Sequence, residues 1–142
     1  MRQSYSELYV HLVWATWDRV PLLVPELQRF VFADILCECD KVKAQVLALG
    51  GTEDHVHLLA QIPTTLSVAM LAKQAKGASS HLVTHGYEAG APFRWQAGFG
   101  GFTVSRWDVP KIQDYIRRQP EHHRGGTTAE RLERIFLPEP SQ

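Results

Sequence analysis

Several features that would mark a specialised class of protein are scarce or absent in this chain. It has two cysteines, Cys37 and Cys39, and no apolar run approaches the length of a membrane span, about 20 residues. The first five residues lack the apolar core of a secretory signal. The two cysteines stand two apart in a predicted helix, so they face different directions and cannot chelate one metal. These absences indicate a cytoplasmic protein with no membrane segment and no disulfide framework.

A surplus of positive charge is also absent, since 15 basic and 15 acidic residues give a formal net charge of zero. Proteins that bind long duplexes nonspecifically are usually basic, because phosphate neutralisation drives that binding. Any nucleic-acid contact of this chain must therefore come from local patches. Residues 94–124 have a modest basic bias, with three acidic residues against Arg94, Arg106, Lys111, Arg117, Arg118 and Arg124.

The length of 142 residues suits one domain with a proper core. Residues rich in Tyr, Val and Leu alternate with segments of helical periodicity, and Pro and Gly separate them. These patterns predict strands over 5–16, 42–49, 55–62 and 93–105, the last one bent or divided by glycines. Helices are predicted over 26–39, from Thr65 or Ser67 to about residue 85, and after Asp108.

The order of these elements is β-α-β-β-α-β followed by a further helix. It predicts an α+β, ferredoxin-like fold, an antiparallel sheet with two helices on one face. The other face is expected to stay open, which would suit nucleic acid. Residues 1–124 are predicted to form the domain, and the polar residues 125–142 a loose C-terminal tail.

Two histidines mark the third predicted strand. His55 and His57 share one face, because side chains of a strand alternate with a period of two residues. Val56 and Leu58 belong to the opposite, apolar face, which is expected to meet the helices. Two imidazoles at this spacing can ligate one metal ion, although two surface or hydrogen-bonded histidines would look the same in a sequence.

A tyrosine and a glutamine stand four residues apart in the last predicted helix. At that spacing Tyr115 and Gln119 face the same way, and Pro120 predicts that Gln119 is the last helical residue. A helical tyrosine is more often a core residue than a nucleophile. Its phenol, which titrates near pH 10, would need a metal ion to polarise its target.

These residues together resemble a known family. The run Glu53-Asp54-His55-Val56-His57-Leu58-Leu59 resembles the metal-binding motif of single-tyrosine HUH transposases of the IS200/IS605 type. His11-Leu12-Val13-Trp14 resembles the first strand of that family, and residues 95–124 (WQAGFGGFTVSRWDVPKIQDYIRRQPEHHR) resemble its REP-associated branch. The resemblance covers residues 5–124.

The resemblance implies a function for the site. His55, His57 and Gln119 would be ligands of Mg²⁺ or Mn²⁺, and Tyr115 the nucleophile. The enzyme would be a homodimer that recognises single-stranded DNA folded into hairpins. It would cleave the DNA through a 5′-phosphotyrosine bond and rejoin strands without ATP. This chain departs from the family where Trp17-Asp18 follows the first strand in place of a basic stretch.

Weaker candidates could contact DNA around this site. Lys73 and Lys76 lie on the second predicted helix and could touch phosphates or simply form its solvated face. Arg94 could grip extruded bases together with Trp95 and Phe99, although an aromatic strand is more often core. The remaining candidates, near the predicted tyrosine, are Arg117, Arg118, His122 and His123. His11 is expected to be a hydrogen-bonded core histidine.

Two other functions suit the same residues. The chain could be a hairpin-binding protein that has lost cleavage, although the presence of both histidines, Tyr115 and Gln119 argues against loss. It could instead be a zinc hydrolase using His55, His57 and either His122 or His123, with the tyrosine in the core. A zinc enzyme of that kind would form no covalent DNA adduct.

Overall fold

The fold is taken from a computed structural model that describes residues 3–86 and 93–137, without the side chains of residues 78–86. It has a four-stranded antiparallel sheet in the order β2-β3-β1-β4. This is the predicted ferredoxin-like arrangement, so the fold class is confirmed. The elements, in chain order, are β1 (Tyr9–Ala15), η1 (Trp17–Arg19), α1 (Pro25–Lys41), β2 (Gln45–Gly51), β3 (His55–Gln61), α2 (Val68–Gly86), β4 (Gly100–Val104), α3 (Val109–Arg117), α4 (Gln119–Gly125) and α5 (Glu130–Glu133).

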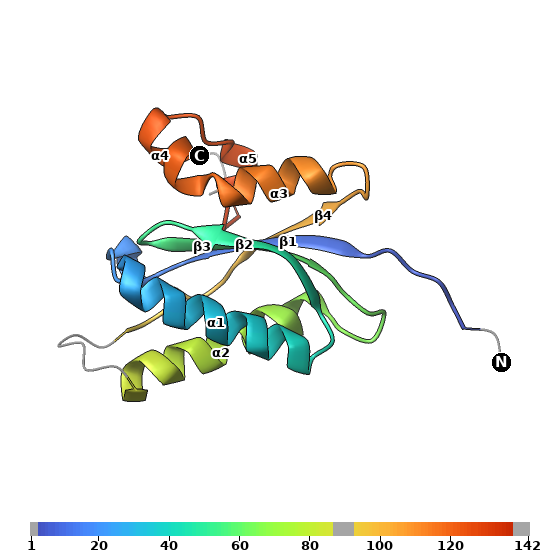
Figure 1. The fold of residues 1–142 in the computed structure, drawn as a ribbon, viewed down its shortest axis with the longest axis horizontal. Coiled ribbons are helices and arrows are strands. Elements are labelled where there is room, and N and C mark those ends of the chain that lie inside the picture. Colours follow the sequence, from blue (N-terminus) through green and yellow to red (C-terminus); the bar gives the residue numbers. More distant parts are fainter. Residues whose placement is uncertain (1–2, 87–92, 138–142) are drawn as a thin grey trace.

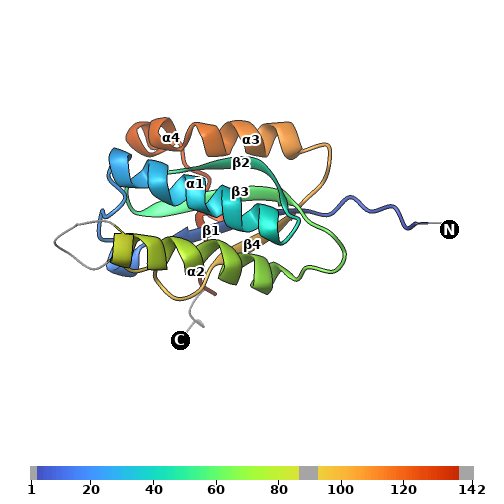
Figure 2. The ribbon, with the colours of Figure 1, turned by 60° about the horizontal axis from the view of Figure 1, so that its bottom comes forward.

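One face of the sheet packs on α1 and α2, which lie side by side (Figures 1 and 2). The apolar face of β3 points this way, and Val56, Leu58 and Ala60 are fully buried there, as predicted. α1 contributes a stripe at helical spacing, Leu27, Val31, Ile35 and Cys39. Burial of each such aliphatic side chain stabilises the fold by about 1.5–3 kcal/mol. Cys37, in contrast, is exposed, so the two cysteines do face different directions.

The opposite face is not open, and that prediction was wrong. α3, α4 and α5 lie across it (Figure 1), where Ile112 and Ile116 of α3 pack against Ala48 and Leu59. Close approach of α3 needs a residue without a side chain on β2, because a Cβ at Gly50 would lie 2.3 Å from the Ile116 carbonyl oxygen. The histidine face of the sheet is therefore enclosed between β3 and these helices.

Two other boundaries differ in detail from the predictions. Residues 93–105 form an isolated bridge between Trp95 and Thr16 and then β4, so the divided alternative is correct. Asp108 precedes α3 as expected, but its side chain accepts a hydrogen bond from Ser105 instead of capping the helix. The domain boundary at residue 124 stays a prediction, and α5 beyond it packs back onto the sheet.

Candidate active site

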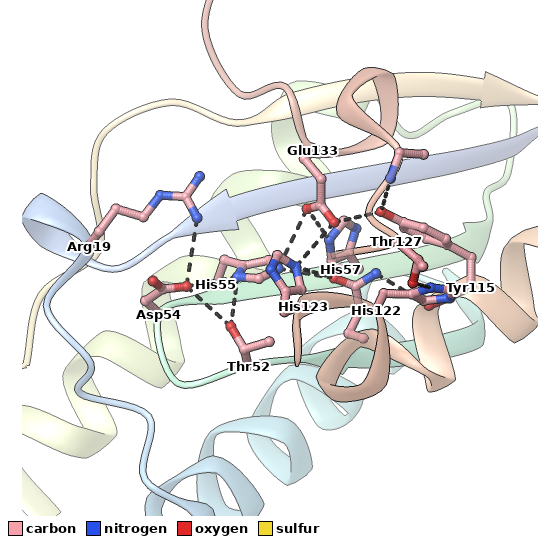
Figure 3. A network of polar contacts seen from close by, with 12 residues as sticks. Arg19, Thr52, Asp54, His55, His57, Tyr115, His122, His123, Thr127 and Glu133 are labelled. Carbon is pink, nitrogen blue, oxygen red and sulfur yellow. Dashed lines mark hydrogen bonds and ion pairs between the residues drawn. The ribbon is translucent and has the colours of Figure 1, made fainter. Parts of the chain in front are cut away.

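The two histidines of β3 lie side by side under the C-terminal helices (Figure 3). His55 is 1% exposed and His57 0%, and their ring centroids are 5.1 Å apart. The alternation of the strand gives both rings the same face, and α3 to α5 close over them. Paired imidazoles are thus held where water is scarce and where an unsatisfied nitrogen would be costly.

Each histidine is oriented by a hydrogen bond at Nδ1. His55 Nδ1 lies 2.8 Å from both the Asp54 carboxylate and the Thr52 hydroxyl. The hydrogen bond from His55 holds the pKa of Asp54 below its usual range. His57 Nδ1 lies 2.8 Å from His11 Nε2 on β1, and burial lowers the pKa of His57. These contacts turn both Nε2 atoms toward the space beneath α4 and α5, as metal-ligating histidines require.

Tyr115 reaches the same space from α3. Its hydroxyl donates a hydrogen bond of 2.6 Å to Glu133 and accepts one of 3.0 Å from the Ala129 backbone N–H. Its ring stacks on His122, with centroids 4.8 Å apart. Burial raises the pKa of the Tyr115 hydroxyl, and the bond to Glu133 adds to this, while the Ala129 N–H acts in the opposite direction. The predicted nucleophile is therefore protonated in this environment and needs a further charge to ionise.

Gln119 is also brought to the histidines, but not on the tyrosine's helix. α3 ends at Arg117, Arg118 has non-helical dihedral angles, and Gln119 begins α4. The expectation that Gln119 ends the helix of Tyr115 was wrong, because Pro120 fits the start of a new helix. The amide oxygen of Gln119 still lies 3.1 Å from His55 Nε2, and its nitrogen donates to the Tyr115 carbonyl.

Glu133 of α5 completes the arrangement and was missed in the sequence. One carboxylate oxygen lies 2.8 Å from His57 Nε2 and 3.5 Å from His55 Nε2, and the other accepts from Tyr115. Burial alone would raise the pKa of Glu133, but hydrogen bonds from His57 and Tyr115 outweigh it and lower the pKa to about 2. His55, His57 and Glu133 offer ligand atoms within 4.8 Å of one another, a cluster that could hold a metal ion.

The adjacent histidines surround this cluster. His123 Nε2 lies 3.1 Å from the Gln119 amide oxygen and 3.3 Å from Glu133. His122 contacts the Thr127 hydroxyl through Nδ1, 2.9 Å away. A hollow of about 450 Å³ borders His123, and another of about 460 Å³ borders Tyr115 and His122. Neither hollow is lined by His55, His57 or Glu133, so the open space borders the neighbours of the cluster and not the cluster itself.

The other candidate DNA contacts lie apart from the cluster. Lys73, Lys76 and Arg94 border one groove of about 470 Å³ with Trp95 and Phe99. Within it Lys73 is exposed, the Lys76 ammonium donates to the Gln96 and Gly98 carbonyls, and Arg94 stacks on Trp17, 4.0 Å from the ring centre. Arg117 is exposed, and Arg118 is paired with Glu121 and Asp114.

The chain is similar to known transposases over most of its length. The transposases for insertion sequence element IS200 of Salmonella typhimurium strain LT2 and of Salmonella typhi are each 28% identical to it over 138 residues. The match covers 92% of this chain and 84% of theirs. Among the described helices, none is both long and apolar enough to cross a membrane.

Two solved structures share the fold. A protein of Deinococcus radiodurans R1 assigned as a transposase superimposes with a TM-score of 0.63 at 27% identity, covering 82% of this chain and 93% of that one. A REP-associated tyrosine transposase bound to a REP hairpin gives a TM-score of 0.64 at 15% identity, over 90% and 74%. At that identity the second likeness is one of fold.

A family model described as that of IS200-like transposases matches residues 4–119. The resemblance to single-tyrosine transposases of the IS200 type, first drawn from the motifs around His55 and Tyr115, is thereby confirmed. Because the match spans most of the chain, this protein belongs to the IS200-like transposase family.

Proposed function

We propose that this protein cleaves and rejoins single-stranded DNA at hairpins, with Tyr115 as the nucleophile. The observation that carries the proposal is the position of the Tyr115 hydroxyl. It shares one carboxylate, that of Glu133, with His57 Nε2, so the phenol and the paired histidines face one small space. In a fold shared with DNA transposases, that combination suits phosphodiester cleavage.

The separation between two of the proposed donors also fits a divalent ion such as Mg²⁺ or Mn²⁺. His55 and His57 would hold the ion through Nε2, and Gln119 through its amide oxygen, 3.1 Å from His55 Nε2. Adjacent ligands of an ion bound at about 2.1 Å lie about 3.0–3.4 Å apart, which this contact matches. A divalent ion bound there would polarise the scissile phosphate and offset its charge.

The residues of the chain supply the remaining steps. The phenol oxygen of Tyr115 forms a bond to phosphorus as the bond from phosphorus to the 3′ oxygen breaks. The phenol loses its proton and the released 3′ oxygen gains one, so the reaction conserves the phosphodiester. The Ala129 N–H, 3.0 Å from the phenol oxygen, stabilises negative charge there. Attack by a 3′-hydroxyl reverses the step and rejoins the strands.

Two observations support DNA as the partner: the ligand of a structural neighbour and the positions of basic residues. The structural neighbour solved with a REP hairpin supports a hairpin as substrate. Lys73 and Arg94 in their shared groove, and the exposed Arg117 of α3, would contact phosphates. We also propose a homodimer, although one chain already brings the tyrosine to its own histidines, so cleavage need not depend on a partner.

The proposal is tested by incubating the protein with hairpin oligonucleotides from the repeats of its own genome. Mg²⁺, Mn²⁺, Zn²⁺ and a chelator are compared, and products are resolved on denaturing gels. Cleavage with a protein–DNA adduct in Mg²⁺ or Mn²⁺, lost in the chelator and in His57→Ala, supports it. Hairpin binding without cleavage in any metal would instead favour a regulatory binding protein. Zinc-dependent cleavage without an adduct would favour a hydrolase.

A further inference from the structure

Glu133 is a residue of this site that no sequence motif indicates. It lies 76 residues from His57 in the chain, in the short helix α5, yet its carboxylate is inserted between the histidines and the tyrosine (Figure 3). Its side chain is 17% exposed, and both oxygens have partners. A buried carboxylate in contact with two imidazoles is costly unless hydrogen bonds or a cation compensate it.

We infer that Glu133 is a protein ligand of the same divalent ion, beside His55 and His57. The inference rests on the proposed function and deepens it. The Glu133 oxygen near the histidines lies 2.8 Å from His57 Nε2 and 3.5 Å from His55 Nε2. These are close to the separations of about 3.0–3.4 Å expected between ligands that share one ion.

A carboxylate changes which ion the site prefers. Two imidazoles and an amide oxygen form a neutral set, and imidazole suits Zn²⁺, Cu²⁺ or Fe²⁺ better than Mg²⁺. Carboxylate oxygen favours harder ions such as Mn²⁺ and Mg²⁺, and its charge offsets half of the ion's charge. Glu133 therefore supplies the chemical feature that the histidine motif alone lacks.

The position of Glu133 is fixed by packing that is independent of any ion. Leu132, the preceding residue, packs against the cluster of Ile112 and Ile116. The backbone after α5 runs so close to β4 that a Cβ at Gly100 would lie 1.8 Å from the Arg134 carbonyl oxygen. The segment is thus held against the sheet, and the carboxylate is presented to the histidines before an ion arrives.

The same carboxylate connects the ion site to the nucleophile. While one oxygen faces His55 and His57, the other accepts the hydroxyl of Tyr115 at 2.6 Å. The Glu133 carboxylate would therefore lie between the Tyr115 hydroxyl and the ion. In this inference Ala129 and Glu133, which both lie beyond residue 124, belong to the working site.

The test measures the binding of Mn²⁺ to the full chain without DNA. Isothermal titration calorimetry gives the affinity, and the electron paramagnetic resonance signal of free Mn²⁺ gives the fraction bound. Glu133→Gln keeps the size of the side chain and removes its charge. Glu130→Gln, on the same helix and 92% exposed at its side chain, is the matched control. Tyr115→Phe removes the hydrogen bond to Glu133 but leaves the ligand.

Glu133→Gln is expected to weaken Mn²⁺ binding by at least the ~10–100-fold that loss of an outer-shell partner costs. Glu130→Gln is expected to bind Mn²⁺ like the unaltered protein, and Tyr115→Phe, which removes one hydrogen-bond partner of the carboxylate but leaves the ligand, is expected to lose less affinity than Glu133→Gln. Circular dichroism establishes that each variant is folded, and Glu133→Asp, expected to bind weakly because its carboxylate is set back, provides a second variant.

The possible failures are distinguishable. If the unaltered protein binds Mn²⁺ and Glu133→Gln binds it equally or more tightly, Glu133 is no ligand, and the cleavage proposal still stands. Tighter binding would identify α5 as a plug over the site. If the unaltered protein binds no Mn²⁺ at all, both this inference and the metal-dependent function are overturned.

Discussion

His11 Nε2 lies 2.8 Å from His57 Nδ1, between adjacent strands and fully buried. Burial and the neighbouring His57 lower the pKa of His11 to about 3, so His11 is neutral near pH 7. In this structure His57 donates from Nε2 to the Glu133 carboxylate, so an ion bound through Nε2 requires the hydrogen of His57 to lie on Nδ1 instead and to donate to His11. The hydrogen of His11 then lies on Nδ1, an atom without a partner among the described residues. The role expected of His11, a core histidine, thus extends to control of its neighbour's tautomer.

Replacement of His11 by Leu is therefore expected to weaken Mn²⁺ binding by about 10–100-fold, as loss of an outer-shell partner does. Calorimetric titration measures the affinity directly. Phe102→Leu is the control, because that ring packs 5.6 Å from His11 without joining the hydrogen bond. Unchanged affinity in His11→Leu would show that the contact has no part in orienting His57.

A substitution at Gly100 on β4 provides a second test of the same site. A Cβ at Gly100 would meet the Arg134 carbonyl oxygen at 1.8 Å, so Gly100→Ala must displace the backbone after α5. We expect a loss of about 1–3 kcal/mol in unfolding free energy and weaker Mn²⁺ binding, because Glu133 moves with that backbone.

The neighbouring glycine provides the comparison for this effect. A Cβ at Gly101 would meet nothing closer than 3.5 Å, so Gly101→Ala should leave metal binding intact. Equal Mn²⁺ affinity in the two alanine variants, both folded, would contradict the dependence of the site on α5.

The two lysines of α2 are expected to behave differently. Lys73 is exposed, and Lys73→Gln should reduce the slope of log K against log salt for hairpin binding by about 0.7–0.9, one phosphate contact. Lys76 donates to the Gln96 and Gly98 carbonyls, so Lys76→Gln should lower the unfolding free energy by about 1–2 kcal/mol. Fluorescence anisotropy at a series of salt concentrations measures the effect of Lys73→Gln on hairpin binding, and urea unfolding measures the effect of Lys76→Gln on stability. An unchanged salt slope in Lys73→Gln would show that Lys73 does not contact the DNA.

Stability should also depend on pH through Glu38, which joins α1 to α2. Hydrogen bonds from Lys41, at 2.7 Å, and from Gln74 lower the pKa of Glu38 below its ordinary 4.5, against the opposing effect of burial. A lowered folded-state pKa stabilises the fold above the unfolded value and less as the pH falls below it. Glu38→Gln should therefore reduce the loss of stability between pH 6 and pH 3, measured by urea unfolding. An identical loss of stability in both proteins would show that groups other than Glu38 cause the pH dependence.

The sequence was sufficient for the framework because its signals are local. The alternation of β3 placed Val56 and Leu58 on the helical face and the two histidines opposite, and the order of the elements predicted the sheet. Tyr115 was correctly placed on a helix by the periodicity of Ile112 and Ile116. These inferences use side-chain spacing within single elements, where periodicity is informative.

The contacts that enclose the site could not be read in the same way. α5 has four residues, too few for a periodic pattern, and Leu132 among charged neighbours is its only apolar signal. The approach of Glu133 to His57 depends on packing across 76 residues. The break at Arg118 was also missed, because Pro120 can end one helix or begin the next.

The central claim is that Tyr115 forms the covalent bond to DNA. The most direct test incubates labelled hairpin oligonucleotides and Mn²⁺ with the unaltered protein, Tyr115→Phe and the exposed-residue control Tyr5→Phe. Adducts are resolved on a denaturing gel and located by mass spectrometry of their peptides. We predict adducts at Tyr115 in the unaltered protein and in Tyr5→Phe. We predict none in Tyr115→Phe, which should still bind the hairpin. A normal yield of adduct in Tyr115→Phe, or an adduct located at another residue, would contradict the account.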